Sequence, residues 1–169
     1  STATTSPRPA TVTGRSPTVW FTTVRVNAGS ADGVTENDPV ISGDGLVGRI
    51  SSVSRSGSVV SLISDSSSAV SAMILPGGAQ GVVRAKVGDP GTLVLEFLDE
   101  TRNVTTGMSV VTSGWRGEGL SSLYPRGLPI GEITRAPIDE REAIQSVELK
   151  PFADLRNLDI LQILTGGNR

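Results

Sequence analysis

Few residues of this 169-residue chain could perform catalytic chemistry, because the sequence contains no histidine and no cysteine. A Ser-His-Asp triad, an imidazole general base and a His/Cys metal site are therefore excluded. A glycosidase could still use two carboxylates that flank a bond, and Asp65, Asp99 and Glu100 are the candidates for that role. Asp65 ends a strand-like segment before three serines, which is typical of a turn cap, and Asp99 and Glu100 are expected to be solvated. We therefore expect no enzyme.

Two further patterns could hold or activate a substrate. Lys86 with a nearby serine could imitate a Ser-Lys dyad, but it lies in an alternating segment with Arg84, as an exposed strand position would. The glycine-rich residues 127–134 could cradle a phosphate only if a helix followed, and a strand pattern follows instead. The sequence therefore predicts no cofactor site and no metal site.

The glycine-rich segment occurs twice. Residues 45–52 and 127–134 both read as a glycine, a short apolar step, a second glycine and an alternating strand. The segments before them, residues 32–43 and 102–113, match as well, and such self-similarity indicates an internal repeat. We interpret four glycines as turn and corner positions of a small barrel, where they allow positive φ or close backbone approach: Gly45, Gly48, Gly127 and Gly131.

The composition favours an all-β fold with almost no helix. The chain has 20 glycines and 10 prolines, and only 4% of its residues are aromatic. That mixture suits short strands joined by tight turns around an aliphatic core. Short strands follow one another at regular spacing in the first half of the chain, which suggests a small closed barrel.

Pro76-Gly77-Gly78 is the strongest internal boundary signal. The predicted divisions are a disordered Ser/Thr/Pro-rich lead-in at 1–17, a first β-barrel at 18–75, a second at 76–165 with about six strands in each, and a frayed tail at 166–169. Residues 158–164 are expected to close the second unit, whereas the barrel that owns the strand at 69–75 is left open. Trp20 and Phe21 are adjacent in a strand pattern, so one should enter the core and the other should face a partner or the neighbouring domain.

Charge and hydropathy exclude two classes of partner. The net charge is −2, the isoelectric point is near 5.2, and no basic run occurs, which argues against nucleic-acid binding. No apolar run of about 18 residues is present, so nothing here is expected to span a membrane. The chain starts at Ser1 without a signal peptide, and we therefore expect a fragment or a mature product.

Only the second copy of the repeat carries an insertion, at residues 113–126. Large side chains gather there on an otherwise Gly/Ser-rich loop, and such residues often anchor protein interfaces. The candidate partner-binding residues are Trp115, Arg116, Leu120, Leu123, Tyr124 and Arg126. For Tyr124, with Leu123, we favour a role in capping the second barrel, and for Trp115 we favour partner contact.

Three segments together resemble the MreC family of rod-shape-determining proteins. They are residues 34–50, with the pattern GLVGRI at their end, residues 60–65, and residues 110–131, which read VVTSG, then Tyr124-Pro125, then GLPIG. The third has the most specific residue order. The resemblance extends from about residue 19 to residue 164, and it departs from the family pattern at 113–125, where the segment is longer than expected.

This resemblance implies two small β-barrels in tandem that act as a non-catalytic scaffold of cell-wall elongation and maintain cell shape. It implies binding to a class B penicillin-binding transpeptidase and to other Mre and Rod proteins, with self-association of the full-length protein. It also implies a place on the extracytoplasmic face of the bacterial membrane, anchored by an N-terminal segment that is absent here. The alternative is a cell-wall carbohydrate-binding domain or a carboxylate-dependent hydrolase. A groove lined with exposed aromatics would favour the first of these, and two facing carboxylates in a cleft would favour the second.

Overall fold

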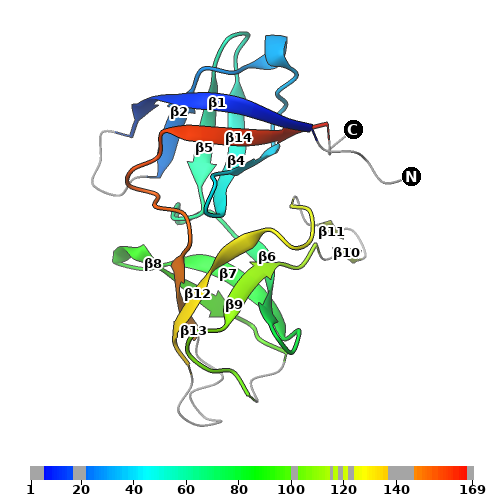
Figure 1. Ribbon diagram of the computed structural model, residues 1–169, viewed down its shortest axis with the longest axis vertical. Coiled ribbons are helices and arrows are strands. Elements are labelled where there is room, and N and C mark those ends of the chain that lie inside the picture. The colour runs from blue at the N-terminus through cyan, green and yellow to red at the C-terminus, as the bar shows by residue number, and fades with distance from the viewer. Residues whose placement is uncertain are drawn as a thin grey trace.

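The computed structural model describes residues 6–16, 22–99, 103–114, 116–117, 120–121, 124–136 and 147–166. Two closed six-stranded β-barrels lie one above the other along the long axis of the molecule (Figure 1). Within the described ranges, the one helical element is the single 3-10 turn η1 (Ser30–Asp32). The prediction of an all-β chain with two small barrels of about six strands is confirmed.

Each barrel has the same order of strands around its wall. Barrel 1 runs β1 (Ser6–Arg15), β14 (Ile160–Thr165), β3 (Pro39–Ile41), β4 (Leu46–Val53), β5 (Ser58–Leu62) and β2 (Thr23–Val26), which pairs with β1 again. Barrel 2 runs β12 (Pro129–Arg135), β13 (Val147–Pro151), β8 (Asp89–Glu96), β7 (Gln80–Lys86), β6 (Val70–Leu75) and β9 (Ser109–Thr112), which pairs with β12. A separate two-stranded sheet is formed by β10 (Arg116–Gly117) and β11 (Leu120–Ser121).

Alternating side chains fill the two cores with aliphatic residues. Alternation places every second residue of a strand inside, and burying a branched aliphatic side chain contributes about 1.5–3 kcal/mol. The fully buried side chains include Ile50, Leu62, Leu161 and Ile163 in barrel 1, and Ile74, Leu93, Ile133 and Leu149 in barrel 2. The low aromatic content of the sequence therefore appears as two small cores built mainly from valine, leucine and isoleucine.

The repeated glycines sit where strands bend. In β4 the register against β3 shifts by one residue at Val47, and in β12 the register against β9 shifts at Ile130. The next residue in each strand is a glycine whose added Cβ would lie 2.0 Å from the Ser61 carbonyl oxygen (Gly48) or 2.2 Å from that of Lys150 (Gly131). A bulge of this kind bends a strand and brings two backbones close together.

The four glycines that were interpreted as turn and corner positions meet different structural needs. Gly48 and Gly131 lie inside strands, where the close backbone approach matters and the sign of φ does not. Gly127 is a true turn residue with φ of 93°. Gly45 adopts no positive φ, and its missing side chain leaves room for Pro129 of the other barrel, whose carbonyl oxygen would lie 2.8 Å from an added Cβ.

The strands depart from the predicted domain boundaries in two places, and one strand that the sequence left open is assigned. Residues 6–15 of the supposed lead-in form β1, which is Ser/Thr/Pro-rich because most of its side chains face solvent and only Ala10 is buried. The last strand closes barrel 1 rather than barrel 2, and β6, which was left unassigned, belongs to barrel 2. Both strands follow connections that cross between the barrels, and proximity in sequence does not reveal such crossings. Residues 1–5, Trp20, Phe21 and residues 167–169 lie outside the described part of the chain.

Candidate functional site

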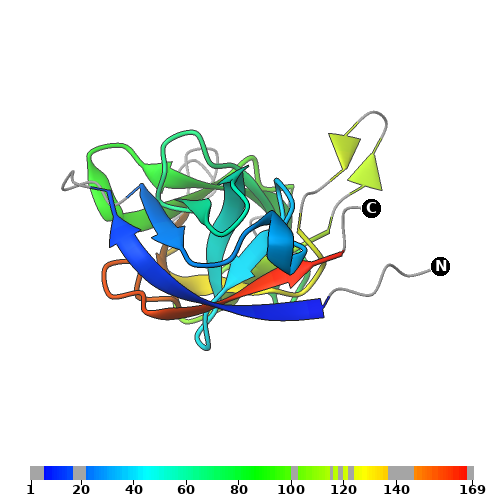
Figure 2. The ribbon, with the colours of Figure 1, turned by 90° about the horizontal axis from the view of Figure 1, so that it is seen from above.

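The insertion at residues 113–126 replaces a tight turn. In barrel 1, β3 and β4 are joined through Ser42–Gly45, where the Ser42 amide donates to the Gly45 carbonyl at 2.9 Å. The equivalent bond in barrel 2 runs from the Thr112 amide to the Leu128 carbonyl, also at 2.9 Å. Between these two residues the chain leaves the body as the β10–β11 hairpin, on the side where β1 begins and β14 ends (Figure 2). The same barrel corner is thus a simple turn in one copy and a projecting arm in the other.

The arm is the insertion at residues 113–126, and its neck is the place where residues 112–114 meet residues 124–128. One buried threonine, Thr112, holds this neck. Thr112 donates its hydroxyl hydrogen to the Pro125 carbonyl at 2.5 Å, and the same oxygen accepts the Leu128 amide at 2.8 Å. The Gly127 amide donates to the Thr112 carbonyl at 2.8 Å. A side chain that bridges both strands of a neck fixes their separation, so the hairpin is mounted on a rigid base.

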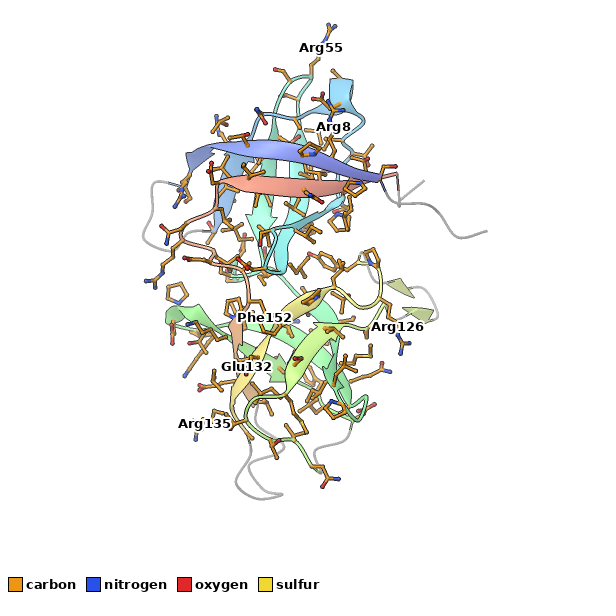
Figure 3. The ribbon with its side chains drawn as sticks, in the orientation of Figure 1. Arg8, Arg55, Arg126, Glu132, Arg135 and Phe152 are labelled. Atoms are coloured by element: carbon orange, nitrogen blue, oxygen red, sulfur yellow. The ribbon has the colours of Figure 1, made fainter. Side chains whose placement is uncertain are left out.

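Gly114 and Arg126 close the neck one step further out. Gly114 has φ of 60°, and a Cβ added to it would lie 2.8 Å from Cβ of Arg126. Arg126 itself is exposed, and its side chain leaves the body beside the hairpin (Figure 3). Of the six predicted partner-binding residues, Arg126 is the one whose side chain the structure describes as accessible.

Tyr124 is buried at the base of the arm, with 5% of its surface exposed. Burial raises the pKa of its phenol to about 12, against a smaller opposing effect of the positive charge of Arg49. Arg49 belongs to β4 of barrel 1, so the neck of the insertion packs where the two barrels meet. The covered ring of Tyr124 fits the capping interpretation, and the side chain offers no exposed surface to a partner in this structure.

The other predicted contacts are only partly placed. Trp115 and Leu123 lie outside the described residues. Arg116 and Leu120 are described through their backbone alone, which pairs Arg116 with Ser121 and Gly117 with Leu120. Sequence reasoning missed the roles of Thr112 and Gly114 in the neck. Their position at the boundary between the repeat and the insertion was the available signal, since such a boundary must hold both ends of the inserted chain.

Three of the four residues considered for catalysis have structural partners. Asp65 accepts the amide of Ser67 at 3.0 Å as a turn cap, and Asp99 accepts the amide of Gln80 at 2.8 Å. Lys86 forms an ion pair with Glu148 across the outer face of barrel 2, so its ammonium group is engaged. Glu100 lies outside the described residues. These contacts explain the residues as parts of turns and of a charged strand surface.

The described ranges contain neither a metal-binding cluster nor an aromatic-lined groove. Among the residues that the structure describes, no group of three or more His, Cys, Asp or Glu side chains could hold a metal ion. No helix of this part of the chain is long and apolar enough to cross a membrane. The described aromatic residues are Phe97 after β8, Phe152 after β13 and the buried Tyr124, which lie on three separate elements. They do not form the aromatic-lined groove expected of a carbohydrate-binding domain.

The sequence matches the family described as "Rod shape-determining protein MreC, barrel core" over residues 12–165. It is 32% identical to the cell shape-determining protein MreC of Escherichia coli K12 over 146 residues, which cover 86% of this chain and 38% of that protein. It is 31% identical to MreC of Listeria monocytogenes over 161 residues, which cover 94% of this chain and 53% of that protein. The chain thus spans about half or less of the length of these relatives.

Solved structures give the same result. A structure of Listeria monocytogenes MreC superposes with a TM-score of 0.85 at 30% identity, and covers all of this chain and 80% of that one. The major periplasmic domain of the cell shape-determining filament MreC superposes with a TM-score of 0.78 at 25% identity, and covers 95% of this chain and 98% of that one. A complex between the penicillin-binding protein PBP2 and MreC from Helicobacter pylori superposes with a TM-score of 0.68 at 20% identity, covers 95% of this chain and 98% of that one, and supports the fold alone.

Proposed function

Because the chain belongs to the MreC family, we propose that it is the barrel core of a scaffold that maintains bacterial cell shape by binding and positioning a penicillin-binding transpeptidase. The relatives are named as cell shape-determining proteins, and a protein of the same fold from Helicobacter pylori forms a complex with PBP2. In the proposed role the chain contributes a rigid surface and performs no reaction itself.

The observation that carries this proposal is the projecting arm, whose base is held by hydrogen bonds and a buried tyrosine. A closed barrel presents no free strand edges, so a partner must bind its loops or its faces. The β10–β11 hairpin is the described element that leaves the two-barrel body, and Thr112 and Tyr124 hold its base. A rigid mount lowers the entropy that is lost on binding, which favours a loop that must position a partner.

The docking surface we propose is the outer part of residues 113–126. Arg126 provides an exposed guanidinium at the neck, and Trp115, Arg116, Leu120 and Leu123 belong to the same short segment of sequence. Trp and Arg side chains are enriched among the residues that dominate interface energies. Tyr124 would support this surface from below without touching the partner.

We place this scaffold on the extracytoplasmic side of the membrane, held there by a segment outside the present sequence. The support is the description of a structural relative as a major periplasmic domain. Contacts with other Mre and Rod proteins, and self-association of the full-length protein, belong to the same proposal. They rest on membership of the family.

A binding experiment tests the docking surface. The extracellular part of the class B penicillin-binding transpeptidase from the same organism is immobilised, and retention of the wild-type chain is measured by biolayer interferometry. Trp115→Ala and Arg126→Ala should each weaken binding by roughly tenfold or more, since removing a hot-spot residue costs at least about 1–2 kcal/mol. The matched control is Arg55→Ala, because Arg55 is also an exposed arginine but lies at the far end of barrel 1 (Figure 3).

The outcomes separate the site from the function. Wild-type affinity in both arm variants, with binding intact, would reject the arm as the docking surface while keeping the scaffold role. No binding of the wild-type chain to the transpeptidase would reject the proposed partner. Equal weakening by Arg55→Ala would indicate that general charge, rather than the arm, drives retention.

A further inference from the structure

Barrel 1 is assembled from both ends of the chain, whereas barrel 2 is continuous in sequence. All six strands of barrel 2 lie between Val70 and Pro151. Barrel 1 takes β1 to β5 from the first part of the chain and is completed by β14, the last strand. Figure 1 shows β1 and β14 side by side in the upper barrel, coloured from opposite ends of the sequence.

The strand β14 occupies the place in barrel 1 that β6 occupies in barrel 2. Ile163 of β14 pairs with Val40 of β3, and Ile74 of β6 pairs with Val110 of β9. Since β3 and β9 are the strands that precede the two corners of the repeat, β14 and β6 are equivalent. The strand that begins barrel 2 in sequence therefore has its counterpart in barrel 1 at the very end of the chain.

Two connectors of the same design exchange these strands between the barrels. After β5, Asp65 accepts the Ser67 amide at 3.0 Å, and the chain then enters β6 of barrel 2. After β13, Asp154 accepts the Arg156 amide at 3.2 Å, and the chain then enters β14 of barrel 1. Each barrel thus sends its chain into the other immediately after its own β5 or β13.

β1 of barrel 1 donates three hydrogen bonds to the residues just before β14. Arg15 of β1 donates to the carbonyls of Arg156 and Leu158, the latter at 2.9 Å. The Val12 amide donates to the Asp159 carbonyl at 2.8 Å. Without β14, the strands β1 and β3 would each present an unpaired edge, and the places of the buried Leu161 and Ile163 would be empty.

We propose that β14 is a closing strap. Barrel 1 stays folded only while barrel 2 is folded, whereas the folding of barrel 2 does not depend on barrel 1. Pairing β14 with β3 closes a chain loop that contains the whole of barrel 2, and an unfolded loop of that length opposes the pairing entropically. A folded barrel 2 shortens the free loop to its two connectors. Barrel 1 consequently closes last, and it opens whenever barrel 2 opens.

Native-state hydrogen exchange on the full chain tests this order with a matched pair of variants. Ile163→Ala in the strap should lower the protection of amides in β2 to β5 by roughly thirtyfold or more, and leave β7, β8, β12 and β13 unchanged. Ile74→Ala, at the equivalent position of barrel 2, should lower protection in both barrels. If Ile163→Ala lowers both barrels equally, or Ile74→Ala leaves barrel 1 unchanged, the proposal is wrong.

A rearranged chain separates the strap from ordinary contact between the barrels. Thr165 donates its hydroxyl hydrogen to the Ser6 carbonyl at 2.9 Å, so a short turn can join β14 directly to β1, as residues 76–79 join β6 to β7. Moving residues 158–166 to the front of Ser6 makes barrel 1 continuous. In this permutant Ile74→Ala should no longer lower the protection of barrel 1. Continued loss there would assign the coupling to the barrel interface and overturn the strap.

Discussion

The two barrels share a backbone framework but cap it with different side chains. At the turn before β3, the Asn37 amide donates to the Ile50 carbonyl at 2.8 Å, and the Ile50 amide donates to the Asp38 carbonyl at 2.9 Å. Before β9, Gly107 and Met108 make the same two bonds with Ile133, both at 2.9 Å. The hydrogen bonds required by barrel closure are thus identical in the two copies, while the side chains at the turn are free to differ.

The side chains differ most at the last residue of this turn. In barrel 1 the buried Asp38 accepts both the amide of Thr35 at 2.9 Å and its hydroxyl at 3.0 Å. In barrel 2 the amide of Thr105 meets the sulfur of Met108 at 3.4 Å instead. Sulfur is a weak acceptor, so barrel 2 holds the turn through backbone bonds and apolar contact. The backbone hydrogen bonds of this turn are therefore common to both barrels, whereas the side chain that supports the turn differs between them.

The shared part of the framework should give the largest effect. Gly48→Ala and Gly131→Ala each place a Cβ within 2.0–2.2 Å of a backbone carbonyl oxygen, which no side-chain movement can relieve. We expect each to cost about 3 kcal/mol or more of unfolding free energy, at the upper end of overpacking effects. Chemical denaturation measures this loss.

The control for these glycines is Gly43→Ala. An added Cβ there meets nothing within 4 Å, and φ is not positive, so we expect a change within about 0.5 kcal/mol. If Gly131→Ala is tolerated and Gly48→Ala is severely destabilising, the two bends are not equivalent. The conclusion that the two barrels share one backbone framework would then be wrong.

These glycines also show what sequence could predict. The repeat, the all-β class and the glycine positions could be predicted from the sequence, because a few consecutive residues are enough to indicate a turn or an alternating strand. Gly45 was assigned to the turn that it does help to form, but the sequence did not show that its missing side chain also admits Pro129 of the other barrel. That contact joins segments far apart in the sequence. Local reading cannot detect it.

The strand exchange escaped prediction for the same reason. The pattern of residues 158–164 shows a strand but does not show which barrel receives it. For Tyr124 the sequence favoured a capping role but also kept the residue among the partner-binding candidates, and its ring is covered where the neck meets Arg49 of barrel 1. Within the candidate site, the insertion itself was predictable, and the division between supporting and exposed residues was not.

Tyr124 supplies the second test, which concerns the corner that only barrel 2 elaborates. Burial raises the pKa of its phenol from the usual value of 10.0 to about 12, so the folded protein retains the proton when the unfolded chain has lost it. This stabilisation is complete below pH 10 and is lost as the pH rises from 10 to 12. The loss should reach about 2 to 3 kcal/mol.

The measurement is simple because Tyr124 is the single tyrosine of the chain. Phenolate absorbance reports its titration directly, and urea denaturation at several pH values reports the stability. Tyr124→Phe serves as the control, since it should remove this part of the alkaline loss while other groups continue to titrate. A wild-type phenol that titrates near pH 10 would show that the neck is open to water and that the insertion is not rigidly mounted.

The third test concerns the residue at which the two turns differ. Asp38→Ala removes two charge-assisted hydrogen bonds and leaves the Thr35 amide without its side-chain acceptor, so we expect a loss of about 2 kcal/mol. Met108→Ala removes a weaker, half-buried contact and should cost about 1 kcal/mol. Thermal and urea denaturation of the two variants measure the difference.

If Met108→Ala is as damaging as Asp38→Ala, the sulfur contact and its packing match the carboxylate in strength, and the side chain at this turn is as tightly constrained as the backbone. If Asp38→Ala is harmless, the backbone bonds to Ile50 alone hold the turn, and the buried carboxylate of barrel 1 must be explained by something other than closure of the barrel.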